Sequence, residues 1–331
     1  MLKTVEKNED RIPELITLGH ILMDIRAYVD EFPSPDSSVK IKGQIQYSPG
    51  GSATNVAVAA AKLGINSAIC SILGFDAYGI EVMKQLMNER VDVSNIKINY
   101  QKPTGISMVI VNNVGEPIII QSLGANEPYP MSYLNVQNIQ AAKHLHMTGT
   151  DPKALEKAAE IAKTSKKNKV TVSFDPGRSI SYLGYEKLMA IIKNVDYLII
   201  NRKEAASVAE LSKETDILEI IDALRSKVPS TTNLVIKGGS KETIVKSSKE
   251  FFAVPPFNVK VFDTIGAGDA FGGAFIVGLL QKKSLKDSII MAHANASYKI
   301  QFGGAQSSAT TEQIEEFMAA HENEITPRDL D

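Results

Sequence analysis

Short apolar runs alternate along this chain with longer segments of helical period, and this alternation limits the folds that the chain can adopt. Residues Leu15–Gly19 form an apolar run, residues Ala53–Leu63 form an alanine-rich segment, and residues Ser67–Leu73 form the next apolar run. This order predicts a strand, a helix and a second strand. Such a unit places its two strands in parallel, with the helix on one face of their sheet.

The same alternation continues through most of the chain. It predicts strands at 144–147, 170–174, 197–200 and 234–237, and helices at 152–163, 185–192 and 217–225. Repeated in this way, the pattern is typical of an α/β fold with a mostly parallel central sheet and helices on both faces. No linker, low-complexity segment or internal repeat divides the sequence, so we expect a single domain over residues 1–331.

Two stretches, at 25–48 and 104–121, interrupt the alternation with patterns typical of antiparallel hairpins. The second stretch alternates Ile106, Met108 and Ile110 before a turn at 112–115. We expect both stretches to form a small β-strand lid over one edge of the main sheet. The apolar side chains of this lid would either cover a bound substrate or pair with a second lid in a homodimer.

The balance of charges argues against two classes of partner. With 36 Lys and Arg against 38 Asp and Glu, the net charge of −2 provides no basic surface for nucleic acid or an anionic membrane. The charged first ten residues do not resemble a signal peptide, and no apolar run approaches the ~20 residues of a membrane span. The single cysteine, Cys70, fits a reducing compartment. We therefore expect a cytoplasmic protein.

A glycine-rich stretch late in the chain, DTIGAGDAFGGAF at 263–275, is the main candidate for a functional loop. We expect a short strand at Val259–Phe262 and a buried helix at Ala270–Leu280, with Gly266–Asp269 forming the turn between them. The free amides and the dipole of a helix N-terminus bind anions, and glycines let a phosphate approach the backbone. The loop therefore predicts a phosphate site, with a tight turn for helix packing as the alternative.

Two familiar phosphate-binding loops are absent from the sequence. The dinucleotide fingerprint G-x-G-x-x-G fails because Gly272 comes one residue late. The P-loop pattern fails because Ile80 follows Gly79 where a lysine is required. The missing fingerprint weighs against a dehydrogenase in particular.

Three motifs together resemble the ribokinase family of carbohydrate kinases, also called the PfkB family. The stretch Asp263–Asp269 is similar to the family's C-terminal signature, and Gly50–Asn55 with Lys62–Gly64 is similar to its N-terminal signature. Asn201–Glu204 resembles the N-x-x-E motif that lies between them. The order and separation of the motifs agree over residues 14–318, and the resemblance implies a ribokinase-like three-layer α/β fold.

The resemblance implies an ATP-dependent kinase, a transferase that moves the γ-phosphoryl group to a primary hydroxyl. Within the family, the sequence looks most similar to archaeal nucleoside kinases at 146–152, 173–177 and 32–35. Residues 104–121 carry no Lys or Arg, and the first lid stretch carries only Arg26, Lys40 and Lys42, which favours a neutral sugar or nucleoside as acceptor. A sugar-acid or sugar-phosphate kinase of the same family, and a non-catalytic sugar or nucleotide sensor, stay open as alternatives.

The resemblance also implies roles for individual residues. Asp269 would be the general base that takes the proton of the acceptor hydroxyl. An anion hole beside it would be formed by the amides of Gly266, Ala267 and Gly268. The acceptor would lie on Asp24, Gly50, Gly51 and Asn55. Arg178 would reach the acceptor or a phosphate, or it is an ordinary surface arginine.

For the nucleotide and its cations, the resemblance implies three groups of residues. The ATP phosphates would lie on the turn with Lys237, Gly239 and Ser240, and the adenine near His293 and Asn295. Glu242 departs from the family pattern, which usually has a glycine there. Asn201 and Glu204 would organise Mg²⁺ through water, although the same spacing is that of a helix capping box. A potassium site would be formed by Asp263, Ile265, Gly304 and Ser308.

Overall fold

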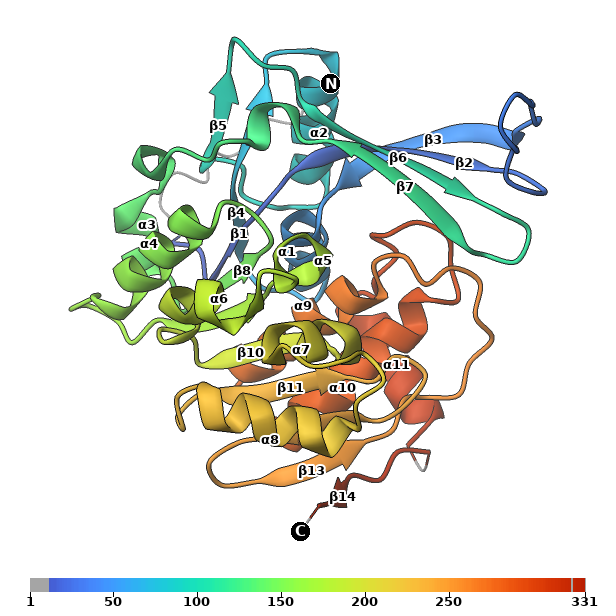
Figure 1. The fold of residues 1–331 in the computed structure, drawn as a ribbon. Coiled ribbons are helices and arrows are strands. Elements are labelled where there is room, and N and C mark those ends of the chain that lie inside the picture. Colours follow the sequence, from blue (N-terminus) through green and yellow to red (C-terminus); the bar gives the residue numbers. More distant parts are fainter. Residues whose placement is uncertain (1–11, 323, 331) are drawn as a thin grey trace.

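A large sheet forms the centre of the computed structural model, which describes residues 12–322 and 324–330 (Figure 1). Its strands are β1 (Leu15–Leu18), β4 (Ser67–Gly74), β5 (Ile96–Asn99), β8 (His144–Thr148), β9 (Thr171–Asp175), β10 (Tyr197–Asn201), β11 (Asn233–Lys237), β12 (Thr243–Lys246), β13 (Phe251–Val254) and β14 (Arg328–Asp329). Their order in the main sheet is β14-β13-β12-β11-β10-β9-β8-β1-β4-β5. The strands from β5 to β11 are parallel, and β12, β13 and β14 extend the sheet with antiparallel pairs.

Helices cover both faces of the main sheet, as the alternation predicts. One face carries α3 (Val136–Ala141), α4 (Pro152–Lys163), α5 (Gly177–Ser181), α6 (Gly184–Ile192), α7 (Arg202–Ala209) and α8 (Ile217–Lys227). The other carries α1 (Ser52–Lys62), α2 (Ala77–Asn88), α9 (Ala267–Leu280), α10 (Leu285–Lys299) and α11 (Thr311–Ala320). Short 3₁₀ turns lie at η1 (Gly124–Asn126) and η2 (Met131–Tyr133). In the described part of the chain, no helix is long and apolar enough to cross a membrane.

Strand side chains alternate between the two helical layers. Leu198 and Ile200 of β10 pack in the core with α4, α6, α7 and α8, whereas Ile199 packs against Phe271 and Phe275 of α9. This alternation follows from the period of two along a strand. Because both faces are covered, the central strands are apolar on both sides, and they read as continuous apolar runs in the sequence.

Four strands form a second, small sheet that projects from the main body (Figure 1). They are β2 (Leu22–Tyr28), β3 (Lys42–Gly50), β6 (Gly105–Val111) and β7 (Pro117–Ser122), in the order β3-β2-β6-β7. The predicted stretches 25–48 and 104–121 both lie in this small sheet. Each contributes an antiparallel pair, and β2 joins them by pairing with β6 in parallel.

The strand predicted at Val259–Phe262 is wrong. Residues 255–262 form no strand, and the amide of Phe262 donates to the carbonyl of Ile300 rather than to a sheet neighbour. Val261 and Phe262 are 55% and 64% exposed, so their apolar side chains do not mark a core strand. The helix also begins earlier than predicted, because Ala267–Asp269 already form the first turn of α9.

Candidate active site

The N-terminus of α9 lies against the loop that follows α10. Gly266 is the N-cap residue, with φ of 81°, and a Cβ on it would lie 2.4 Å from the carbonyl oxygen of Ala305. Only glycine fits this left-handed conformation at so close an approach. No side chain caps the helix, although the Ala267 amide donates to the Thr264 carbonyl at 3.1 Å. The helix end therefore remains suited to an anion.

Asp269 lies in the first turn of α9 and is held by a residue from α1. The side-chain amide of Asn55 donates to Oδ2 of Asp269 at 2.7 Å, and Gln306 in turn donates to Oδ1 of Asn55 at 3.2 Å. Burial raises the pKa of Asp269 to about 6, with Asp175 acting in the same direction, although the Asn55 hydrogen bond and Lys237 oppose the shift. A carboxylate with this pKa can accept a proton near neutral pH.

Three neighbouring parallel strands end in polar residues at the same edge of the main sheet. Asp175 ends β9, Asn201 ends β10 and Lys237 ends β11. Ligands of parallel sheets bind at this carboxyl edge. The Lys237 ammonium forms an ion pair with Oδ2 of Asp175 at 2.5 Å, and a Cβ on Gly268 would lie 3.4 Å from its Nζ. The ammonium therefore lies beside the start of α9.

Asp175 is a site residue that the sequence reading missed. It lies in the FDPGR stretch, three residues before Arg178, and the signal for it in the sequence is its position directly after the strand predicted at 170–174. Burial alone would lower the pKa of Lys237, but the charges of Asp175 and Glu204 outweigh it and raise that pKa. Lys237 is therefore a cation in the site at neutral pH.

Asn201 and Glu204 form the capping box that their spacing allows. Oδ1 of Asn201 accepts from the Glu204 amide at 3.0 Å, and Oε2 of Glu204 accepts from the Asn201 amide at 2.9 Å. Burial raises the pKa of Glu204, as does Asp175, whereas Lys237 and Arg178 lower it. Across the described residues, no cluster of three or more His, Cys, Asp or Glu is arranged to hold a metal directly. Asn201 and Glu204 both carry side-chain oxygens, the type of ligand that magnesium prefers.

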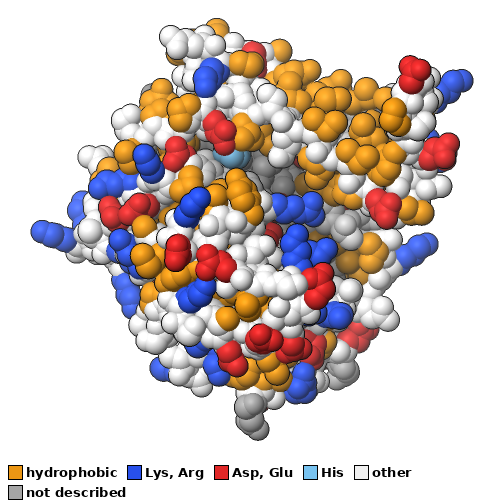
Figure 2. Space-filling view, viewed as in Figure 1, with side chains coloured by type: hydrophobic (Ala, Val, Ile, Leu, Met, Phe, Trp, Pro, Cys, Tyr) orange, Lys and Arg blue, Asp and Glu red, His pale blue; other side chains and the backbone are white. Residues whose placement is uncertain are grey.

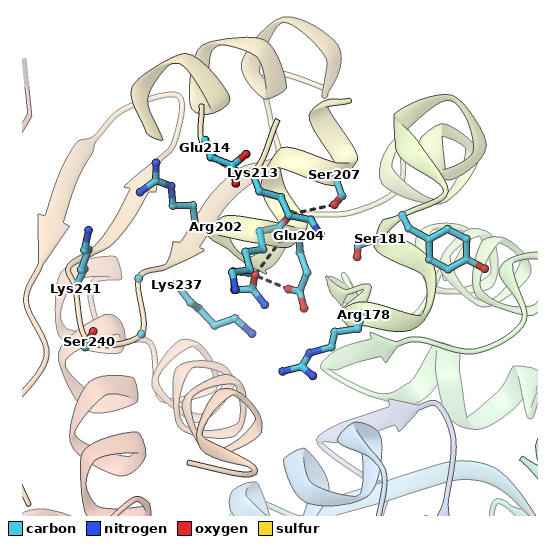
Figure 3. A pocket seen from close by; sticks show the side chains of 15 residues that line it. Arg178, Ser181, Arg202, Glu204, Ser207, Lys213, Glu214, Lys237, Ser240 and Lys241 are labelled. Carbon is cyan, nitrogen blue, oxygen red and sulfur yellow. Dashed lines mark hydrogen bonds between the residues drawn. The ribbon is translucent and has the colours of Figure 1, made fainter. Parts of the chain in front are cut away.

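A cavity of roughly 970 Å³ opens above this edge of the sheet, between α5, α7 and the β11–β12 turn. It unites six residues predicted from the sequence: Arg178, Asn201, Glu204, Lys237, Gly239 and Ser240. In Figure 3, the side chains of Arg178, Glu204 and Lys237 point toward one another in this cavity. Further basic side chains line it at Arg202, Lys203, Lys213 and Lys241. The excess of cations suits a polyphosphate.

The predicted acceptor residues lie where the small sheet meets the main body. Asp24 of β2 is 7% exposed, and a Cβ on Gly50 would lie 2.0 Å from its Oδ1, so the carboxylate rests on bare backbone. Burial raises the pKa of Asp24 to about 6, while Arg26 and a hydrogen bond from Ser107 oppose the shift. Gly51 follows as the N-cap of α1. The segment from Gly50 to Asn55 therefore connects the two carboxylates, because Gly50 lies against Asp24 and Asn55 donates to Asp269.

Two residues predicted near the adenine do not line this cavity. Asn295 of α10 is fully buried, donating to the Ala270 carbonyl at 2.8 Å and accepting from the Ala309 amide at 2.9 Å. These bonds hold its side-chain amide between α9 and the segment that leads into α11. His293 is 4% exposed and lies edge-on to the Phe271 ring, with centroids 5.3 Å apart. Both residues face α9 because α10 packs along that helix.

Two of the residues predicted to hold potassium, Ile265 and Gly304, contact Asp263. The amides of Ile265 and Gly304 donate to its carboxylate at 2.9 and 3.0 Å, and the Ser308 side chain is buried. Two side-chain cations also reach Asp263: Arg26 from β2 and Lys299 from α10. Neither was predicted at this position.

Comparisons with known proteins agree on one family. The model of the pfkB family carbohydrate kinases matches residues 13–312. An ATP-dependent ribose-1-phosphate kinase from Halopiger xanaduensis is 30% identical over 92% of this chain and 98% of its own length. A nucleoside kinase from Methanocaldococcus jannaschii is 26% identical over 91% of this chain and 95% of its own. The fold matches Arabidopsis thaliana ribokinase complexed with ribose and ATP, with a TM-score of 0.81, 23% identity, and coverage of 93% and 99% of the two chains.

Proposed function

The chain belongs to the pfkB family of carbohydrate kinases, and we propose that it transfers the γ-phosphoryl group of ATP to a primary hydroxyl of a neutral sugar or nucleoside. The observation that carries this proposal is the position of Asp269. Its carboxylate accepts from Asn55 on the acceptor side, and it lies on the same helix turn as Gly268, which neighbours Lys237 on the phosphate side.

In the proposed mechanism, Asp269 takes the proton of the acceptor hydroxyl while the hydroxyl oxygen attacks the γ-phosphorus of ATP. The bond from this phosphorus to the bridging oxygen breaks, and ADP leaves with that oxygen. The carboxylate is mostly ionised at neutral pH, because its pKa is about 6, so it can act as a general base. The amides at Gly266–Gly268 and the dipole of α9 stabilise the charge on the transferred group. The Lys237 ammonium adds a positive charge beside them.

ATP and Mg²⁺ are the proposed cofactors. Lys237, Gly239 and Ser240 would hold the phosphates in the cavity, while Asn201 and Glu204 would hold magnesium through water. When bound, the metal neutralises charge between the phosphate groups. The capping box keeps the Glu204 carboxylate in a fixed position at the start of α7, so the same contacts serve the helix and the site.

The acceptor is proposed to carry a ribosyl group. Ribose, ribose-1-phosphate and nucleosides, which the names of the relatives specify, share this group and its primary hydroxyl. Asp24 can accept hydrogen bonds from two neighbouring sugar hydroxyls that lie on the Gly50–Gly51 backbone. The small sheet offers few cations to an anionic acceptor, because Arg26 pairs with Asp263 and Lys42 pairs with Asp30.

Arg178 is the observation that favours a second candidate, a sugar-phosphate acceptor. Its side chain is exposed at the cavity and has no hydrogen bond or ion pair with another described residue. A free guanidinium binds phosphate well. If the acceptor carries a phosphate, Arg178 is therefore the residue that we propose binds it.

The small sheet is also proposed to pair two chains in a homodimer. Asp24 and Ser107 are register partners on one face, so Ile25 and Met108, one residue further along, share the opposite face. This outer face continues through Tyr47, Ile118 and Ile120, which are exposed. Figure 2 shows hydrophobic side chains gathered over this sheet. An apolar face directed away from Asp24 suits a second chain better than a substrate.

An ADP-release assay over a panel of acceptors tests the proposal. We expect turnover with ribose or a nucleoside, and little with fructose, inositol or 2-keto-3-deoxygluconate. Ribose-1-phosphate tests the second candidate. If it is the acceptor, Arg178→Gln should weaken the binding of ribose-1-phosphate and leave the binding of neutral acceptors unchanged. Asp269→Asn serves as the control for contaminating ATPase. Absence of acceptor-dependent ADP release across the whole panel would contradict the proposed function.

A further inference from the structure

Two buried cations converge on Asp263, the first residue of the glycine-rich loop. Nη1 of Arg26 donates to Oδ2 of Asp263 at 2.7 Å. Nζ of Lys299 donates to the main-chain oxygen of Asp263 at 2.7 Å and lies 3.9 Å from Oδ2. The exposed fractions are 2% for Arg26, 0% for Lys299 and 6% for Asp263. A buried pair of cations is costly unless it is well compensated, so this arrangement calls for a function.

The cluster connects the segments that shape the proposed anion hole. Arg26 comes from β2 of the small sheet, Lys299 from the last turn of α10, and Asp263 from the loop that leads into α9. Gly304 donates its amide to Oδ2 of Asp263, and the adjacent Ala305 carbonyl is the atom that a Cβ on Gly266 would strike. Moving Asp263 would therefore move the backbone at Gly266.

A potassium ion does not fit this environment. Potassium needs oxygen ligands that are free to face it, whereas the main-chain oxygen and Oδ2 of Asp263 accept hydrogen bonds from Lys299 and Arg26. The backbone of Ile265 and of Gly304 presents amides to the Asp263 carboxylate. Two positive side chains already face one carboxylate, so a third cation would be repelled.

We propose that the Lys299 ammonium, with the Arg26 guanidinium, replaces a monovalent cation beside the anion hole, so that this protein needs no potassium. Only the expected effect on turnover rests on the proposed kinase function; the expected effect on the structure at the start of α9 does not. Lys299 is a positioning residue: it touches neither substrate nor the reacting atoms, and it acts by fixing Asp263 and through it the start of α9.

The charge state of Lys299 is consistent with this role. Burial lowers its pKa to about 8, with Arg26 acting in the same direction, while Asp263 and Asp269 oppose the shift. The side chain therefore stays mostly protonated at neutral pH. Lys299 lies in the last turn of α10, where the negative end of the helix dipole stabilises its positive charge.

The test compares wild type, Lys299→Met and the control Lys286→Met in potassium chloride and in tetramethylammonium chloride of equal ionic strength. Lys286 lies on the same helix but forms an exposed ion pair with Asp329. Two measurements need no acceptor: thermal unfolding, and hydrogen exchange at 263–270. Turnover with the best acceptor of the panel is the third. If no acceptor in the panel is phosphorylated, only the turnover measurement is lost, and thermal unfolding and hydrogen exchange still test the proposal.

We expect wild type and Lys286→Met to behave alike in both salts, with turnover within about twofold. Lys299→Met in tetramethylammonium should exchange faster at 263–270 and lose up to about 100-fold in turnover, because a shifted anion hole misaligns the transferred group. Potassium should partly restore Lys299→Met, since removing the ammonium frees the main-chain oxygen of Asp263 and removes one of the two positive charges beside it.

Two results would overturn the proposal. One is a wild type that potassium, but not tetramethylammonium, stabilises or activates severalfold. The other is a Lys299→Met protein whose exchange at 263–270 in tetramethylammonium equals that of Lys286→Met. If Lys299→Met does not fold, Lys299→Arg keeps the charge and should retain potassium independence, and potassium dependence in this variant would count against the proposal.

Discussion

The side-chain amide of Asn55 donates a hydrogen bond to Oδ2 of Asp269 at 2.7 Å, although 214 positions separate the two residues in the sequence. This bond joins α1, which follows Gly50 and Gly51, to α9, which begins at the proposed anion hole. It helps to fix the orientation of the carboxylate that we propose as the general base.

Replacing the proposed base should stop the chemical step and leave nucleotide binding in place. We expect Asp269→Asn to lower kcat by roughly 10²- to 10⁴-fold, because the amide cannot accept the hydroxyl proton. ATP affinity, measured by calorimetry, should stay close to wild type. Near-normal turnover in a folded Asp269→Asn protein would exclude this residue as the base.

Turnover should depend on pH through the same carboxylate. The pKa of Asp269 is about 6, so kcat/KM should rise as the pH increases through 6 and be about tenfold lower at pH 5 than at pH 7.5. Asp24 has a similar pKa, and Asp24→Asn separates the two groups. If the acidic limb disappears in Asp24→Asn, the limb belongs to Asp24 and this prediction is wrong.

Asp24 should reduce the stability of the protein near neutral pH. Its folded-state pKa of about 6 lies above the ordinary value of 3.8, so the folded state binds the proton more tightly. The stabilisation that comes from protonation of Asp24 is fully present below about pH 4 and is lost as the pH rises through 6. Asp24→Asn should therefore raise the free energy of unfolding at pH 7.5 by up to about 3 kcal/mol while weakening acceptor binding.

Chemical denaturation at pH 4 and pH 7.5 measures this effect. The gain from Asp24→Asn should be small at pH 4. Asp30→Asn is the matched control, because the Asp30 side chain is 70% exposed and its loss should change stability by less than about 0.5 kcal/mol at either pH. An Asp24→Asn protein less stable than wild type at pH 7.5 would show that ionised Asp24 stabilises the fold.

The small sheet should respond to the acceptor and not to ATP alone. If it closes over the site, a good acceptor slows hydrogen exchange at 25–48 and 104–121, whereas ATP slows exchange mainly at 237–240 and 263–270. Asp24→Ala should abolish the acceptor effect and keep the ATP effect. Unchanged exchange in both stretches at saturating acceptor would mean that this sheet is not a substrate lid.

The outer face of the small sheet should carry the subunit contact. We expect Ile118→Ser combined with Ile120→Ser to convert a dimer to a monomer in analytical ultracentrifugation, because both side chains are exposed on this face. Ile119→Ser changes the opposite face of the same strand and should leave the dimer intact. A wild-type protein that is monomeric at micromolar concentration would contradict the proposal.

Local patterns predicted the α/β core well. The helix at Pro152–Lys163 has the predicted bounds, because the Asp151 side chain caps it and Pro152 occupies its first position. The parallel strands were recognisable because burial on both faces makes them continuously apolar. The antiparallel strands β12 and β13 were not predicted, because they follow β11 without intervening helices and so fall outside the alternation of strands and helices.

The candidate site could be predicted only in part, because some of its contacts join segments that lie far apart in the sequence. The ion pair between Lys237 and Asp175 crosses 62 positions, and the bond from Lys299 to Asp263 crosses 36. Neither partner can be identified from spacing, because the sheet and the packing of α10 bring them together. The predicted strand at Val259–Phe262 failed for a related reason: its alternation of apolar residues lies on an exposed loop.

The parallel pairing of β2 with β6 also has a kinetic consequence. The two strands are in register over seven residues, from Leu22 with Gly105 to Tyr28 with Val111. Opening one of the two hairpins by itself would break this ladder, so both must move as one flap about the points where they leave the main body. A fluorophore on either hairpin should then report the same single relaxation rate, and opening would be one microsecond-to-millisecond event shared by segments that lie far apart in the chain.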